Sequence, residues 1–232
     1  MCDHEHLCVA RAMGLAPADV ERVNLSERMP TAGELVEASA VMMGGSGAFH
    51  IYDPEPWIER SLDFLGDWLP RGERPFLGMC FGHQAMVLAC GGEVINDGDN
   101  EELGTFEIRL TEEGRRDPVF AGLPDAFDVQ LGHVDRAVSL PAGWHNLANS
   151  ASQPNQAVRM GEAPVYGFQF HAELRMEDNL YRVRHYAEHY GAECEQVFAE
   201  LMGRHRPTPF GSAVMQGFVA EIKAFWEKQR CA

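Results

Sequence analysis

A cysteine framed by two glycines is the residue of this chain best placed to act as a nucleophile. The apolar run at residues 75–79 leads into the pattern Gly78-x-Cys80-x-Gly82, and a helix-like pattern begins directly after it. This arrangement is typical of a nucleophile elbow, a tight strand-to-helix turn that holds one reactive side chain clear of a sheet. Glycines are required in such a turn because a Cβ would collide with neighbouring backbone. We therefore predict that Cys80 is a nucleophile.

A histidine and a glutamate that could activate this cysteine occur about ninety residues later. The β-branched and aromatic residues from Val165 to Phe170 predict a strand that ends at His171. Since side chains alternate along an extended chain, His171 and Glu173 leave the strand on the same side. A carboxylate beside a histidine fixes its tautomer and stabilises the imidazolium, and a paired histidine raises the thiolate fraction of a cysteine. The sequence therefore predicts a triad of Cys80, His171 and Glu173.

These two segments resemble the class I glutamine amidotransferases, which carry a Gly-x-Cys-x-Gly-x-Gln elbow and a Phe-His-Pro-Glu-like triplet. Weaker matches occur in the family's order at the diglycine Gly44-Gly45, at residues 102–104 and in the loop at residues 132–135. The resemblance covers about residues 19 to 175 and is nearest to the glutaminase domain of GMP synthetases. Two positions depart from the family pattern: Ala172 replaces the usual proline, and Ser46 follows the diglycine in place of proline.

The resemblance implies hydrolysis of the glutamine side-chain amide to glutamate and ammonia through a thioester on Cys80, with no metal or organic cofactor. Backbone N–H groups of Gly45 and Phe81 are the expected oxyanion hole, since such donors act where negative charge develops. By the same resemblance, family members pass the ammonia to a synthetase domain or subunit. The residues expected to hold the glutamine are Gly44, Gln84 and the backbone around Gly132 and His133.

Two alternatives remain open at this stage. A γ-glutamyl hydrolase acting on another glutamyl amide would use the same thioester chemistry. A binding or regulatory protein could keep the fold without turnover, and Ala172 leaves room for that interpretation. The sequence alone does not identify the ammonia acceptor, the oligomeric state or any need for a partner.

Length and composition limit the class of protein. A chain of 232 residues suits a single domain spanning 1–232, and its formal charge of −16 argues against a nucleic-acid partner, which needs clustered cations. No run of eighteen apolar residues and no basic-then-apolar leader is present, which predicts a cytoplasmic protein without a membrane span. The six cysteines lack Cys-x-x-Cys spacing, which argues against a zinc ribbon or a disulfide framework.

Strand-like and helix-like segments alternate along the chain, which predicts an α/β fold with a doubly wound, largely parallel sheet and helices on both faces, the flavodoxin-like fold of the family. The final part of the chain, 176–232, has the pattern of a C-terminal helical extension of the same domain. The N-terminus begins with a helical pattern, so we expect the fold to lack its usual first strand. The expected strands lie at Val20–Leu25, Ala40–Met43, Arg74–Met79, Glu93–Asn96, Phe106–Leu110 and Val165–Phe170.

Three other histidine-containing patterns compete with this assignment. His185 to His189 fits the His-x-x-Glu-His pattern of some zinc peptidases, but so short a pattern can arise by chance and no third ligand is evident. Asp3-His4-Glu5-His6 is more typical of a helix start than of a metal site. His83 lies three residues past Cys80 in the elbow helix, where a packing role is more typical than that of a base. We therefore expect no metal site.

Overall fold

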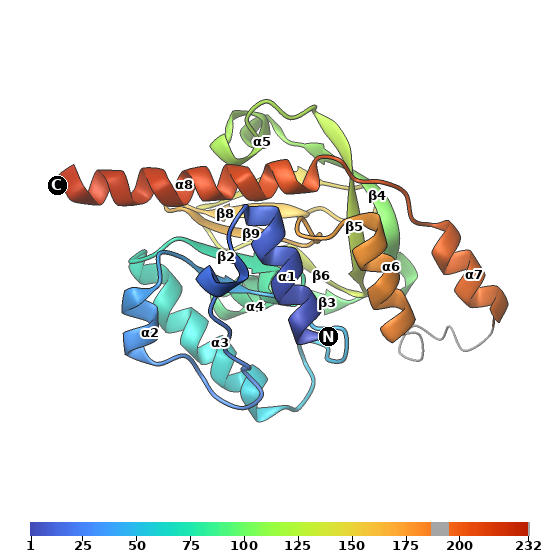
Figure 1. Ribbon diagram of the computed structural model, residues 1–232, viewed down its shortest axis with the longest axis horizontal. Helices are drawn as coiled ribbons and strands as arrows, with labels where there is room; N and C mark the ends of the chain where they lie inside the picture. Colours follow the sequence, from blue (N-terminus) through green and yellow to red (C-terminus); the bar gives the residue numbers. More distant parts are fainter. Residues whose placement is uncertain (187–194, 232) are drawn as a thin grey trace.

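The computed structural model describes residues 1–186 and 195–231. Its centre is a seven-stranded sheet with helices on both faces, and a two-stranded sheet lies beside it (Figure 1). Within the two described ranges, none of the helices combines the length and apolar character that a membrane span requires. The strands are β1 (Val41–Met43), β2 (Phe76–Met79), β3 (Glu93–Asn96), β4 (Glu102–Leu110), β5 (Ala126–His133), β6 (Asp135–Ser139), β7 (Trp144–Asn149), β8 (Ala157–Met160) and β9 (Val165–Phe168).

The large sheet has the strand order β1-β2-β9-β8-β7-β4-β5, and β3 pairs with β6 in the small one. The predicted fold class is confirmed, but the sheet is mixed. β1, β2 and β9 run parallel, whereas β8, β7, β4 and β5 continue the sheet in antiparallel fashion. The connections at 150–156 and 161–164 are too short for the crossover that a parallel pair needs, so those neighbours must run antiparallel.

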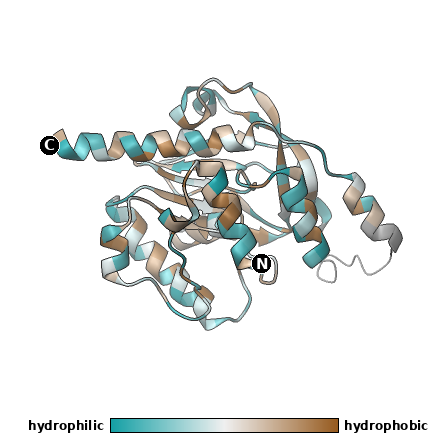
Figure 2. Cartoon of the chain, viewed as in Figure 1, coloured by the Kyte–Doolittle hydropathy of each residue, from teal (hydrophilic) through white to brown (hydrophobic). Residues whose placement is uncertain are grey.

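Two apolar cores lie on opposite faces of the sheet because successive side chains of each strand point to opposite sides. Leu77 and Phe168 belong to the core beneath α8, where Phe218 is fully buried, while Phe76 faces the other core, together with Met86 of α4. Hydrophilic and hydrophobic residues alternate along α8, as expected of a helix with one face on a core (Figure 2). The helices are α1 (Cys2–Met13), α2 (Ala32–Glu37), α3 (Pro56–Trp68), α4 (Phe81–Ala89), α5 (Glu112–Arg116), α6 (Met176–His185), α7 (Glu195–Gly203) and α8 (Gly211–Cys231).

One expected strand is wrong. Residues Val20–Leu25 have an irregular backbone, although the hydrophobic side chains among them are half-buried. A strand needs a neighbour that takes up its backbone hydrogen bonds, and β1 lies at the border of the sheet with β2 as its partner. As the N-terminal pattern predicts, α1 is the first element of residues 1–186, and no strand in that range comes before β1.

The three parallel strands bring the predicted reactive segments to one edge of the sheet. Met43, Gly78 and Gly167 lie in register across β1, β2 and β9. Because parallel strands end at the same edge, the segments that follow them meet there. Cys80 and His171 leave this edge from adjacent strands.

Candidate active site

Cys80 sits in a strained turn between β2 and α4. Its backbone has φ 49° and ψ −105°. In the described part of the chain Cys80 is the one non-glycine residue with positive φ, and such a conformation costs about 1–3 kcal/mol. A Cβ at Gly78 would lie 2.5 Å from the carbonyl oxygen of Gly82, and a Cβ at Gly82 would lie 2.1 Å from that of Met43. Both contacts are with backbone, so this turn requires glycine at both positions.

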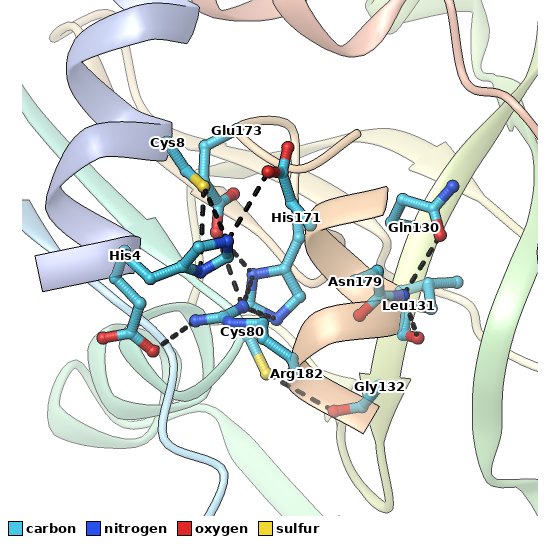
Figure 3. A network of polar contacts seen from close by, with 12 residues as sticks. His4, Cys8, Cys80, Gln130, Leu131, Gly132, His171, Glu173, Asn179 and Arg182 are labelled. Atoms are coloured by element: carbon cyan, nitrogen blue, oxygen red, sulfur yellow. Dashed lines mark hydrogen bonds and ion pairs between the residues drawn. The ribbon is translucent and has the colours of Figure 1, made fainter. Parts of the chain in front are cut away.

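His171 lies against Cys80 and is held by Glu173 (Figure 3). Nδ1 of His171 is 2.8 Å from Oε1 of Glu173, and the backbone N–H of His171 donates to the Gln130 carbonyl of β5 at 2.9 Å. A Cβ built on Gly45 would lie 2.8 Å from Cε1 of His171 and 3.3 Å from Cβ of Cys80. The structure therefore brings the cysteine, the histidine, the glutamate and the diglycine together.

The two predicted oxyanion donors are next to this group. Phe81 is the first residue of α4, where backbone N–H groups have no partner within the helix. Gly45 packs against the Cys80–His171 pair, as the contacts of its Cβ position show. The carbonyl oxygen of Gly44 accepts from the N–H of Gly82 at 3.2 Å, which fastens the diglycine segment to the elbow.

Opposing influences act on the charge of the buried His171–Glu173 pair. Burial by itself lowers the pKa of His171, but the Glu173 carboxylate more than offsets this effect, and the pKa rises from 6.5 to about 9. Burial tends to raise the pKa of Glu173, but His171 and Arg182 outweigh it and hold that pKa below its ordinary value. At neutral pH the pair is therefore an imidazolium beside a carboxylate.

A small pocket opens beside the Cys80 thiol. Its volume is about 20 Å³, roughly the space that one water molecule needs. The strand-end segments line one side of it, together with Gly132 of β5, whose carbonyl oxygen is 4.0 Å from Sγ of Cys80. The other side is formed by Asn179, Arg182 and Tyr186 of α6 and its C-terminal cap.

The predicted glutamine-holding residues take two different places. Gly132 lines the pocket, whereas Gly44, Gln84 and His133 are not among the described residues that do so. The Gln84 side-chain amide donates to the Asp135 carbonyl at 2.8 Å, so it stabilises the segment that follows β5. The His133 ring likewise points into the interior, where its Nδ1 is 3.1 Å from the same carbonyl.

Glu102 is a buried carboxylate whose role the sequence analysis did not assign. Its Oε1 accepts hydrogen bonds from Ser150 and Ser152, both at 2.6 Å, and its Oε2 accepts from Gln156 at 2.6 Å and lies 3.1 Å from Nε2 of His133. Burial tends to raise the pKa of Glu102, but the hydrogen bonds from His133 and the two serines outweigh it and lower that pKa. This charged cluster fixes the strand end that carries Gly132.

His83 is buried and does not line the pocket beside Cys80, so its position does not suit an alternative base. It is fully buried, and its Nδ1 lies 2.6 Å from where a Cβ on Gly167 would stand. Burial lowers the pKa of His83 to about 3, so the ring is neutral at physiological pH. Its position matches the packing role that the sequence analysis favoured.

The inward face of α6 carries the site residues that sequence reasoning missed. The spacing of Asn179, Arg182 and Tyr186 is i, i+3, i+7, so the sequence could have placed them on one helix face. The spacing alone does not assign them to a reaction. Asn179 donates to Oε1 of Gln130 at 3.1 Å and so binds α6 to β5. The packing of this helix over the strand ends gives these side chains their place in the pocket.

One cluster of metal-ligand residue types occurs within the described ranges, at His4, Cys8 and Asp178. Nε2 of His4 lies 3.7 Å from Sγ of Cys8 and 3.5 Å from Oδ1 of Asp178. Asp178 already binds the guanidinium groups of Arg11 and Arg175, which repel a second cation. The His185–His189 pattern extends to residues 188 and 189, which lie outside the described residues.

Comparisons with known proteins identify the family. Residues 10–183 match the family model of class-I glutamine amidotransferase. The chain is 31% identical over 137 residues to a glutamine-hydrolysing GMP synthase of Thermosipho africanus, covering 59% of this chain but 24% of that protein. It is 36% identical over 129 residues to a glutamine-hydrolysing GMP synthase subunit of Thermococcus kodakarensis, covering 56% of this chain and 61% of that protein.

A solved structure from Thermoplasma acidophilum, described as one subunit of a GMP synthase, shares the fold. The TM-score is 0.71 at 22% identity, with 99% of this chain and 92% of that chain covered. In sequence, the chain spans about a quarter of the GMP synthase from Thermosipho and less than two thirds of the Thermococcus protein.

Proposed function

The chain belongs to the class I glutamine amidotransferase family, and we propose that it hydrolyses the side-chain amide of glutamine to glutamate and ammonia. One observation carries this proposal. Cys80 stands at a strained strand-to-helix turn against His171, which Glu173 holds at 2.8 Å. Nucleophile, base and orienting carboxylate are the parts that acyl transfer from an amide requires.

The reaction follows from the positions of these groups. The Cys80 thiolate attacks the amide carbon, and the negative charge on the amide oxygen is stabilised by the N–H groups of Gly45 and Phe81. The His171 imidazolium donates its proton to the amide nitrogen, the C–N bond breaks and ammonia leaves a glutamyl thioester. Neutral His171 then takes a proton from water, the hydroxide attacks the thioester carbon, and glutamate and the Cys80 thiolate are released. Glu173 keeps the ring oriented during formation and hydrolysis of the thioester, and it balances the charge of the ring whenever His171 is protonated.

Binding of glutamine requires a change in this structure. A pocket of about 20 Å³ holds a water molecule but not an amino acid. Asn179, Arg182 and Tyr186 in its lining belong to α6 and its cap, whereas Cys80 and the other lining residues lie at or beside the strand ends. We therefore place the opening movement in α6, with the Cys80 turn staying fixed.

A synthetase partner is the proposed destination of the ammonia. The similar GMP synthase from Thermosipho is about four times as long as the matched segment, and the similar Thermococcus protein is by name one subunit of a larger enzyme. A chain that resembles their glutamine-hydrolysing part would supply ammonia to a separate or attached synthetase.

Glutamate release from glutamine by the purified chain tests the proposal. We expect release that Cys80→Ala abolishes and that Cys90→Ala preserves, since Cys90 lies at the end of α4, away from the pocket. Release that survives Cys80→Ala contradicts the assignment. If the intact protein is silent, a γ-glutamyl peptide is tested beside glutamine, and its cleavage would replace glutamine hydrolysis with γ-glutamyl hydrolysis.

A further inference from the structure

Arg182 brings a buried positive charge into contact with the His171 imidazole. Its residue exposure is 9%, and its Nη1 lies 3.1 Å from Nδ1 and 3.5 Å from Nε2 of His171. Nη1 thus lies at similar distances from both ring nitrogens and is not paired with one of them alone. The same atom is 3.7 Å from Oε1 of Glu173 (Figure 3).

This contact differs from an ordinary hydrogen bond. Nδ1 of His171 donates its proton to Glu173 at 2.8 Å, so it has no lone pair to offer, and a guanidinium has only donors. A cation in contact with the ring opposes protonation of His171, whereas Glu173 favours it. Arg182 also competes for the Glu173 carboxylate. The charge of His171 is therefore set by three groups, of which the sequence analysis found two.

A carboxylate of α1 holds Arg182 in this position. Nη2 of Arg182 donates to Oε1 of Glu5 at 2.5 Å. Helix α1 is fixed independently of this pair, because Arg11 binds Asp178 of α6 and the Ala12 carbonyl accepts from Gln216 of α8. Glu5 thus neutralises part of the charge that Arg182 directs at the imidazole.

We infer that Arg182 is a positioning residue of the Cys80–His171–Glu173 site, which orients the imidazole and its carboxylate and, through Glu5, makes the charge of His171 depend on the docking of α1. The inference treats His171 as the base of the function proposed above. The arrangement gives α1 a direct influence on the site, although α1 does not line the pocket in the described residues. The titratable and charged groups around the His171–Glu173 pair are Cys80 of the elbow, Arg182 and Asp178 of α6, and His4, Glu5, Cys8 and Arg11 of α1.

An NMR titration of His171 in protein labelled with 15N-histidine tests this inference. The resonances are assigned by their loss in His171→Gln. We expect Arg182→Gln to raise the titration midpoint by about one pH unit, since a cation in contact is removed. Glu5→Gln should shift the midpoint the opposite way, because Arg182 then acts without its counter-charge. Arg182→Lys keeps the charge and should stay near the wild-type midpoint.

Arg184→Gln is the matched control, because Arg184 is exposed on the same helix. Its midpoint should equal that of the wild type. A folded Arg182→Gln protein whose midpoint stays within about 0.2 units of wild type overturns the inference. If Arg182→Gln does not fold, the titration midpoint of His171 in Glu5→Gln takes its place as the test. An unchanged midpoint in Glu5→Gln then overturns the inference.

The titration needs no substrate, so its result is separate from that of the glutaminase assay. Shifted midpoints in a protein that never releases glutamate would support the positioning role and contradict glutamine hydrolysis. Unchanged midpoints in an active protein would do the reverse.

Discussion

Replacing Glu173 with glutamine removes one negative charge from the site with little change of shape. A glutamine side-chain oxygen can still accept from Nδ1 of His171, so the ring orientation is retained. In the native protein the pKa of His171 is about 9 against an ordinary 6.5, although burial and Arg182 both act to lower it. The rise of about 2.5 units corresponds to roughly 3 kcal/mol of preference for the imidazolium, and Glu173 supplies at least that much.

In Glu173→Gln we therefore expect the His171 pKa to fall to about 6 or below, since burial and Arg182 remain. At pH 7 the ring is then neutral, and the thiolate of Cys80 loses its counter-ion. The rate of glutamate release should drop by about 10² to 10⁴, the range typical for the loss of an orienting carboxylate or of general acid–base catalysis.

Two measurements check this prediction together: the 15N-histidine titration of His171, and glutamate release across the pH range. Thermal unfolding of the variant serves as a control for folding. A folded Glu173→Gln protein with a His171 midpoint still near pH 9 would refute the reasoning. A release rate within a factor of about two of wild type would refute it as well.

Three further predictions follow from the surroundings of the site. Gly82→Ala should lower the free energy of unfolding in urea by about 1–3 kcal/mol or more, because its Cβ would lie 2.1 Å from the Met43 carbonyl oxygen; an unchanged urea midpoint would contradict the close packing. Glu102→Gln should destabilise by about 1–3 kcal/mol in the same assay, since a buried cluster loses its acceptor charge, and equal stability would show that the cluster is not charged. Folding raises the pKa of His171 from 6.5 to about 9, so the stability that protonated His171 contributes is complete below pH 6.5 and is lost as the pH rises through about 9. Over that pH range the urea midpoint should therefore fall by more in the wild type than in His171→Gln. Parallel curves of the urea midpoint against pH for the two proteins would contradict the raised pKa.

The segments that carry the predicted chemistry were readable because their geometry is local. A strand, a glycine on each side of Cys80 and a following helix lie within one short segment, so the strained turn is encoded by adjacent residues. His171 and Glu173 are likewise two residues apart. The fold class followed from the alternation of elements along the chain.

The antiparallel half of the sheet was less visible in the sequence. β5 alternates correctly, with Phe127, Val129 and Leu131 buried, and this period-two signal was overlooked. β8 is harder to find, because Ala157 and Val158 are both buried as consecutive residues on opposite faces of a covered sheet. The strand expected at residues 20–25 has the composition of a strand but no partner for its backbone.

Arg182 and Glu5 could not be paired from the sequence, because they are separated by 177 residues and meet only when α1 and α6 pack together. Glu102 resembles an ordinary acidic residue until Ser150, Ser152 and His133 surround it. The hydrogen bonds of the Gln84 and His133 side chains to the Asp135 carbonyl likewise depend on long-range packing, and their contact with glutamine stays a prediction.

Labelling with a cysteine-directed glutamine analogue, such as a diazoketone derived from glutamine, tests the central claim most directly. Peptide mass spectrometry after treatment reports which of the six cysteines carries the adduct. We expect one adduct on Cys80, which free glutamine prevents and which His171→Gln slows strongly. An adduct on other cysteines with Cys80 unmodified, or labelling that glutamine does not affect, would contradict it.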